Sequence, residues 1–210
     1  MKVVAFNGSP KKEGNTYQLI SAMATELSKE GIEVEIVHVG ASVIRGCVAC
    51  GMCMKNQNGK CIINDDVNGW IEKMKEADGI ILGSPTYFSG VNGTMKAFLD
   101  RAFFVSGVNG NYLRHKVGAA VVAVRRSGGI PTWHELNHYL MYSEMFMPTS
   151  NYWNVVHGRA PGETVQDEEG QQIVRVLGKN MAFLMKSVKL GKESLVAPEQ
   201  EAKAFTSFIR

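Results

Sequence analysis

A short apolar strand, a glycine-containing loop and a helix follow one another at the start of the chain, and this order constrains the fold more than any other feature. Residues 3–6 are an unbroken apolar run, which is typical of a parallel strand covered on both faces. The helix after the loop begins near Asn15 or Thr16, because either side chain can serve as its N-cap. The rest of the chain must supply the strands and helices that cover such a strand.

The first loop, residues 7–16, has the chemistry of an anion site. A helix start offers unpaired backbone N–H groups and the positive end of the helix dipole, and Ser9, Lys11 and Thr16 add hydroxyl donors and positive charge. The loop matches neither G-x-x-x-x-G-K-[ST] nor G-x-G-x-x-G, so a nucleoside triphosphate or an ordinary dinucleotide is not the expected ligand. A capped turn without any ligand is the simpler alternative.

Length and charge favour one globular domain of ordinary size. The chain has 210 residues, 45% of them hydrophobic, and a net charge of +3 from scattered basic residues, which indicates no binding of nucleic acid or of an acidic membrane. No signal-peptide pattern and no membrane-spanning stretch is evident, so we expect a soluble, cytoplasmic protein. We expect one domain over residues 1–190, with a cysteine-rich insertion at 45–64, and a C-terminal tail over 191–210.

Apolar runs and helical periodicity alternate along the whole chain. Strands are predicted at residues 3–6, 32–39, 79–83, 117–124 and 151–156, with amphipathic helices between them and a long one near the end. This order favours a doubly wound parallel sheet of the α/β class. Ligands bind such sheets at the carboxyl ends of the strands. Three glycine-containing loops, residues 7–16, 84–90 and 125–129, leave the sheet at that edge and should meet there.

The second loop, residues 84–90, carries two aromatic residues between polar ones. Pro85 stiffens it, Tyr87 and Phe88 offer flat apolar surface, and Thr86 and Ser89 can form hydrogen bonds with the polar edge of a ring. On its own, this sequence is more often a packed turn. Beside an anion loop it favours a mononucleotide with a flat head.

Four motifs carry a resemblance to a known family: NGSPKKEGNT at residues 7–16, GSPTYFSGVNGTMKAFLDR at 83–101, RRSGG at 125–129, and C-x2-C-x2-C-x7-C at 47–61. Over about residues 1–190 the chain resembles the flavodoxin-like NAD(P)H-dependent FMN reductases, and most closely their iron–sulfur flavoprotein branch. The resemblance implies a five-stranded, three-layer α/β/α fold. It also implies that the first loop holds the FMN phosphate, the second wraps the isoalloxazine ring and the third closes over its pyrimidine side. The expected cofactor-binding residues are Ser9, Lys11, Asn15, Thr16, Pro85, Thr86, Tyr87, Phe88, Ser89, Gly90, Ser127 and Gly128.

All four cysteines, Cys47, Cys50, Cys53 and Cys61, lie in one short segment, which indicates metal or redox chemistry before disulfides. Three cysteines spaced by two residues can bend around one cubane, and the spacer before Cys61 is flexible enough to supply the fourth thiolate of a [4Fe–4S] cluster. The proline that usually follows the fourth cysteine is absent. A structural zinc, free thiols and oxidised pairs are the alternatives.

A second metal motif is spelled by residues 134–138, HELNH, which is the H-E-x-x-H of zinc peptidases. Its helix follows the third loop of a doubly wound sheet, and no H-x-x-G-x-x-H extension is present. We therefore interpret HELNH as a chance match on a polar helix face. Lys96, Asp100 and Arg101 are interpreted as structural residues that fix their helix against neighbours or a partner subunit.

Together these features predict an FMN-dependent oxidoreductase. The donor is NAD(P)H or ferredoxin and the acceptor a quinone, a flavin, an oxygen species or another small molecule; no catalytic acid or base is marked, because hydride transfer to a flavin needs none. The alternatives are a non-catalytic electron carrier or redox sensor and, remotely, a zinc peptidase. By family analogy we expect a homodimer or homotetramer, with a possible subunit arm formed by the tail and its Phe205, Phe208 and Ile209.

Overall fold

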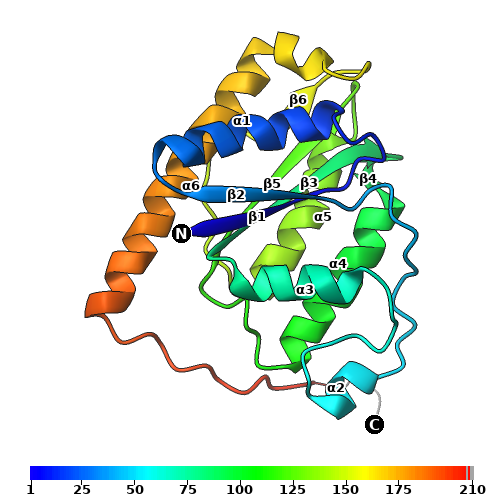
Figure 1. The fold of residues 1–210 in the computed structure, drawn as a ribbon, viewed down its shortest axis with the longest axis vertical. Coiled ribbons are helices and arrows are strands. Elements are labelled where there is room, and N and C mark those ends of the chain that lie inside the picture. The colour runs from blue at the N-terminus through cyan, green and yellow to red at the C-terminus, as the bar shows by residue number, and fades with distance from the viewer. Residues whose placement is uncertain (207, 209–210) are drawn as a thin grey trace.

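Five parallel strands form the centre of the molecule in the order β2-β1-β3-β5-β6 (Figure 1). The computed structural model describes residues 1–206 and 208, so Ile209 of the predicted arm lies outside the described residues. In chain order the five strands read 2-1-3-4-5, which is the flavodoxin-like doubly wound order. The predicted fold class is confirmed. The strands are β1 (Lys2–Asn7), β2 (Glu33–His38), β3 (Gly79–Tyr87), β5 (Val117–Val124) and β6 (Val155–His157), and a short β4 (Gly90–Val91) pairs antiparallel with β3.

Helices cover both faces of the sheet (Figure 1). Side chains of β1 alternate between two buried clusters: Val3 and Ala5 belong to one, Val4 and Phe6 to the other. This alternation explains the unbroken apolar run, since helices cover both faces of a central parallel strand. One face carries α1 (Asn15–Lys29) and α6 (Glu168–Ser194); the other carries α3 (Val67–Glu76), α4 (Gly93–Val108) and α5 (Gly129–Tyr142). The short α2 (Met52–Asn56) and a 3-10 turn, η1 (Glu163–Gln166), complete the described elements.

Two expected boundaries differ from the structure. The second loop is not irregular: β3 continues to Tyr87 and turns back into β4, so residues 84–91 are mostly a β-hairpin. The last strand begins at Val155 rather than at residue 151, and just before it the Asn154 side chain donates to the Ala120 carbonyl. The predicted N-cap of α1 is wrong as well. Gly14 takes this position and no side chain caps the helix.

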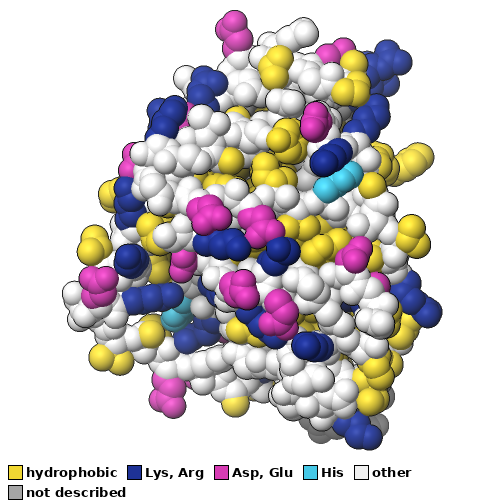
Figure 2. Space-filling view, in the orientation of Figure 1, with side chains coloured by type: hydrophobic (Ala, Val, Ile, Leu, Met, Phe, Trp, Pro, Cys, Tyr) yellow, Lys and Arg dark blue, Asp and Glu magenta, His cyan; other side chains and the backbone are white. Residues whose placement is uncertain are grey.

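The described part of the surface has no large patch of one charge on the face seen in Figure 2, and the C-terminal tail is extended. On this face, basic and acidic side chains are interspersed, in keeping with the small net charge. No helix in the described ranges combines the length and the apolar character needed to cross a bilayer. After Ser194 the chain is extended. Its contacts include the Pro198 carbonyl with Arg114 and Lys203 over the Tyr142 ring, while the Phe205 and Phe208 rings are exposed.

Candidate functional site

The first loop is shaped by two residues that sequence reasoning missed. The buried carboxamide of Asn7 accepts the Ser9 N–H at 3.0 Å and donates to the Lys12 carbonyl at 3.0 Å, so it folds the loop back on the end of β1. The His38 ring contacts the Ser9 carbonyl at 2.8 Å from the end of β2. A polar residue at the end of a buried strand was a signal for Asn7. Nothing in the sequence marked His38, since it lies on another strand.

Close backbone contact holds the first loop from the other side. A Cβ on Gly40 would lie 2.2 Å from the carbonyl carbon and oxygen of Ser9, which is far inside van der Waals contact. A Cβ on Gly8 would lie 2.9 Å from the Gly83 carbonyl, to which Gly8 already donates its own N–H at 2.8 Å. Glycine is therefore required at both positions so that the first loop can lie against β2 and β3.

The start of α1 leaves several donors without partners. The first hydrogen bond of the helix runs from the Gln18 N–H to the Gly14 carbonyl, so the backbone N–H groups of residues 15–17 have no partner within the helix. The Thr16 hydroxyl is buried and has no partner. Asn15 turns its carbonyl oxygen toward Thr164, 3.4 Å away, and Lys11 is exposed. A buried polar atom without a partner is costly, and an anion at this helix start would satisfy it.

The hairpin of β3 and β4 has a strained tip. Phe88 and Ser89 both have positive φ, +49° and +61°, a conformation that non-glycine residues rarely adopt. Tyr87 and Phe88 are exposed. Thr86 is half-buried, but its hydroxyl is fully buried and has no partner. A flat polar-edged ligand beside the hairpin would provide both an apolar contact for the rings and a partner for this hydroxyl.

Neighbouring side chains fix the hairpin in place. The Ser84 hydroxyl accepts the Asn92 N–H at 3.1 Å, and the Asn92 side chain then caps α4 through the Thr94 and Met95 N–H groups. Glu135 on α5 accepts the Val91 N–H at 2.9 Å. The hairpin is thereby tied to two helices at once.

The third loop lies directly against the hairpin. Gly128 has a φ of +84°, and a Cβ there would lie 2.5 Å from the Ser89 hydroxyl oxygen. Ser127 is exposed next to it. Because the first loop also contacts β3 through Gly8 and Gly83, the three loops meet at the carboxyl edge of the sheet. The predicted phosphate-binding and ring-binding residues are therefore neighbours in space.

Glu135 and the two histidines of HELNH have different surroundings. Glu135 is used by the hairpin, whereas His134 and His138 line a cavity of about 670 Å³ between α5 and residues 147–154, away from the three loops. Among the residues that the structure describes, no three His, Cys, Asp or Glu side chains form a group that could hold a metal ion.

The four cysteines line one pocket, next to Phe104 and Val105 of α4. Cys47 and Cys50 are exposed, Cys61 is partly buried and Cys53 is buried, and burial raises the pKa of the Cys53 thiol above its ordinary value. A single zinc ion would draw the sulfurs to about 2.3 Å from itself. A four-iron cluster carries its thiolates on separate iron atoms, further apart. The four thiols thus share one pocket, and within the described residues they do not form a group close enough to hold a single metal ion.

Side-chain hydrogen bonds frame the cysteine segment, residues 45–64. Asn68 accepts the Cys61 N–H at 2.8 Å and donates to its carbonyl at 2.9 Å, and Asn109 accepts the Gly59 N–H and donates to the Cys53 carbonyl. Ala49, between the first two cysteines, has a φ of +52°. Such strain in a non-glycine residue persists only where the surroundings impose it.

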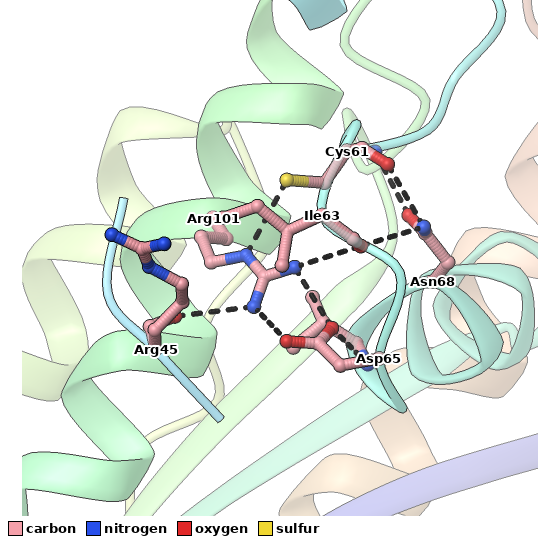
Figure 3. Close-up of polar contacts among 7 residues, drawn as sticks. Arg45, Cys61, Ile63, Asp65, Asn68 and Arg101 are labelled. Atoms are coloured by element: carbon pink, nitrogen blue, oxygen red, sulfur yellow. Dashed lines mark hydrogen bonds and ion pairs between the residues drawn. The ribbon is translucent and has the colours of Figure 1, made fainter. Parts of the chain in front are cut away.

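Arg101 and Asp100 have different surroundings on α4. Arg101 is buried, forms an ion pair with Asp65 and donates to the Cys61 sulfur at 3.4 Å (Figure 3). Burial opposes its charge, but the bonds to Asp65 and Cys61 outweigh this effect and raise the pKa of Arg101. Asp100 accepts hydrogen bonds from Lys96 and from the Tyr139 hydroxyl, and burial together with Asp100 raises the pKa of Tyr139. The expected structural role of these residues agrees with their contacts.

Comparison with known proteins gives consistent results. The family model described as NADPH-dependent FMN reductase matches residues 1–160. An iron–sulfur flavoprotein of Methanocaldococcus jannaschii is 40% identical over 196 residues, covering 90% of this chain and all of its own length. An iron–sulfur flavoprotein of Methanosarcina thermophila is 30% identical over 202 residues, with 92% and 100% covered.

Solved structures share the fold at low sequence identity. RosB with a bound formylriboflavin phosphate intermediate has a TM-score of 0.70 at 17% identity and covers 100% of this chain and 94% of its own. An NAD(P)H:quinone oxidoreductase from Methanothermobacter marburgensis has a TM-score of 0.64 at 15% identity, with 86% and 96% covered. A flavodoxin from the domain Archaea has a TM-score of 0.60 at 16% identity, with 89% and 99% covered. At these identities the likeness concerns the fold.

Proposed function

The chain belongs to the NADPH-dependent FMN reductase family, in its iron–sulfur flavoprotein branch, and on this premise we propose that it passes electrons from NAD(P)H or ferredoxin through FMN to a small acceptor such as a quinone, a flavin or an oxygen species. It is a flavin-dependent oxidoreductase, and its flavin is FMN.

The observation that carries the assignment of the FMN site is a pair of buried hydroxyls without partners, Thr16 in the first loop and Thr86 in the hairpin. An anion at the start of α1 would bond the first and the polar edge of a ring would bond the second. We assign the phosphate to Ser9, Lys11, Asn15 and Thr16. The ring would lie along Pro85–Gly90, with Ser127 and Gly128 at its far edge.

When bound, FMN supplies hydride and single-electron chemistry. This chain's residues bind and orient the group: the open N–H groups of α1 offset the charge of the phosphate, and Tyr87 and Phe88 exclude water from one side of the ring. No carboxylate at the site is assigned as an acid or base. Glu135 is engaged by the Val91 N–H, and Asp100 by Tyr139 and Lys96.

We further propose that Cys47, Cys50, Cys53 and Cys61 ligate a [4Fe–4S] cluster, with thiolates as the only protein ligands. The relatives' names and the shared pocket of the four thiols support this assignment. A cluster would make ferredoxin a suitable single-electron partner. Without a cluster, NAD(P)H would be the donor.

Removal of the two hydroxyls in the first loop tests the phosphate assignment. Ser9→Ala with Thr16→Ala should weaken FMN binding at least about tenfold, because each hydrogen bond to a charged group contributes about 1.5–3 kcal/mol. The control is Thr25→Ala, an exposed threonine of the same helix whose hydroxyl contacts only the Ser21 carbonyl. Kd is measured by flavin fluorescence. Equal affinity in the double variant and the control would refute the assignment.

The visible spectrum of protein purified without air tests the second cofactor. The expected result is a broad iron–sulfur shoulder that bleaches on reduction, with about four irons and four sulfides per chain. A pure flavin spectrum with four titratable thiols would exclude the cluster. Tight FMN without turnover of either nicotinamide would then indicate an electron carrier or redox sensor.

A further inference from the structure

The guanidinium of Arg101 lies where the two ends of the cysteine segment come together (Figure 3). It donates to the Arg45 carbonyl, two residues before the first cysteine, at 3.1 Å. It donates to the Ile63 carbonyl, two residues after the last cysteine, at 3.3 Å. One side chain of α4 thus closes a loop whose ends are 18 residues apart in the chain.

All five N–H groups of this guanidinium have acceptors. Besides the two carbonyls, Asp65 accepts two bonds at 2.6 and 2.8 Å, and the Cys61 sulfur accepts the Nε–H at 3.4 Å. An arginine has five donors in a rigid planar fork, whereas a lysine has three on a flexible stem. Only arginine can serve this set of acceptors, and the set includes one of the four thiols directly.

The arrangement is more than an ion pair inside the core. The fully buried side chain of Arg101 forms an ion pair with Asp65, so its charge is balanced without Cys61. The Nε–H nevertheless points to the sulfur, on the side of the pocket that the four cysteines line. Loss of this contact would leave a buried donor without a partner, so the sulfur and the arginine hold each other in place.

We propose that Arg101 is the positioning residue of the cysteine site: it fastens both ends of the cysteine segment to α4, orients the Cys61 sulfur toward the pocket and donates a hydrogen bond to that sulfur in the loaded site. The last part rests on the proposed cluster. The first two parts concern the protein without metal and can be tested by themselves.

Arg101→Lys keeps the positive charge but removes the planar fork. In the metal-free protein, amide hydrogen exchange of residues 45–64 should become at least about tenfold faster, the factor expected from the loss of one charge-assisted hydrogen bond, while the first loop and the hairpin keep their rates. Lys96→Gln is the matched control, since Lys96 is on the same helix and contacts Asp100 and the Tyr139 ring instead. Unchanged exchange over 45–64 would overturn the proposal, and so would a uniform increase over the whole chain.

The reconstituted protein supplies a second readout. Hydrogen bonds to cluster sulfurs raise the reduction potential, so Arg101→Lys should shift the potential to more negative values and lower the iron retained per chain, with FMN content unchanged. Equal potentials in both proteins would contradict the assigned hydrogen bond. If the wild type binds no iron, the proposed cluster fails, but the exchange experiment still decides whether Arg101 positions the segment.

Asp65→Asn covers the case in which Arg101→Lys does not fold, as judged by circular dichroism and FMN content. This variant keeps the arginine and its bond to Cys61 but weakens the pair that holds the guanidinium. Exchange over residues 45–64 should then rise to a value between those of wild type and a fully released segment. An unchanged rate in folded Asp65→Asn would count against the fastening role.

Discussion

Single polar side chains, buried or partly buried, shape both candidate sites, and two of the three act across a long stretch of chain. Asn7 folds the first loop, Glu135 fixes the hairpin 44 residues away, and Arg101 closes the cysteine segment. Their partners are mostly backbone groups. Sequence reasoning therefore found the loops but missed His38 and Glu135 as supporting residues, because a backbone partner on a distant element leaves no pattern in the sequence. Asn7 was missed although its place at the end of a buried strand was a signal.

Gly40 offers a test of loop support at this scale. Gly40→Ala places a Cβ 2.2 Å from the Ser9 carbonyl group, so the first loop must shift. We expect FMN binding to weaken at least about tenfold and the free energy of unfolding to fall by about 1–3 kcal/mol, as for other overpacked sites. Gly46→Ala is the control, because a Cβ there meets nothing within 4 Å. Equal Kd values and equal denaturant midpoints for the two variants would contradict the inferred clash.

At the scale of elements, the chain's regular segments follow their local sequence closely. The strand at residues 117–124 has the predicted bounds because it is apolar throughout and paired on both sides at its carboxyl end. The hairpin was not predicted. Its tip has Phe88 and Ser89 where such turns prefer asparagine and glycine, so the usual signal is absent. Tertiary contacts from Ser84 and Glu135 hold this turn instead.

Helix α3 contains a glycine whose replacement should stabilise the protein. Gly69 lies in the helix and a Cβ there would meet nothing within 4 Å. Gly69→Ala should raise the free energy of unfolding by about 0.5–1 kcal/mol, measured by urea denaturation, through the higher helix propensity of alanine. The contrast is Gly170→Ala at the start of α6, where the new Cβ would lie 2.4 Å from Val156. That variant should be less stable than wild type, and a gain in stability there would show that the clash is relieved.

Glu35 joins three elements through its ion pairs with Lys2 of β1 and Lys73 of α3. The hydrogen bonds from Lys73 and Lys2 lower the pKa of Glu35 from its ordinary value of 4.5. A lowered pKa in the folded state means that the stabilisation is complete above pH 4.5 and is lost as the pH falls through the lowered value. Glu35→Gln should therefore cost about 0.5–1 kcal/mol of unfolding free energy at pH 7. The difference from wild type should shrink below pH 4.5, and a constant difference down to pH 3 would contradict the assignment.

At the scale of the whole molecule, the alternation of apolar runs and amphipathic helices was enough to predict a doubly wound parallel sheet, and the family resemblance added its flavodoxin-like, three-layer form. The convergence of three loops also followed, because parallel strands end at one edge. The attachment of the cysteine segment did not follow. Arg101 was expected to fix its helix against neighbours or a partner subunit, and its neighbours are the ends of that segment and Cys61 itself. The ion pair with Asp65 spans 36 residues and has no local signature.

Helix α4 connects the two candidate sites as one rigid element. Its cap, Asn92, is bonded to Ser84 at the base of the hairpin, and Arg101 and Asn109 hold the cysteine segment further along. At about 1.5 Å per residue, Arg101 lies about 14 Å along the axis from Asn92. Electron tunnelling slows exponentially with distance. If FMN and the proposed cluster occupy the two sites, the number of residues in this helix sets part of the distance between them, and one inserted turn would lengthen that path by about 5.4 Å and slow electron transfer.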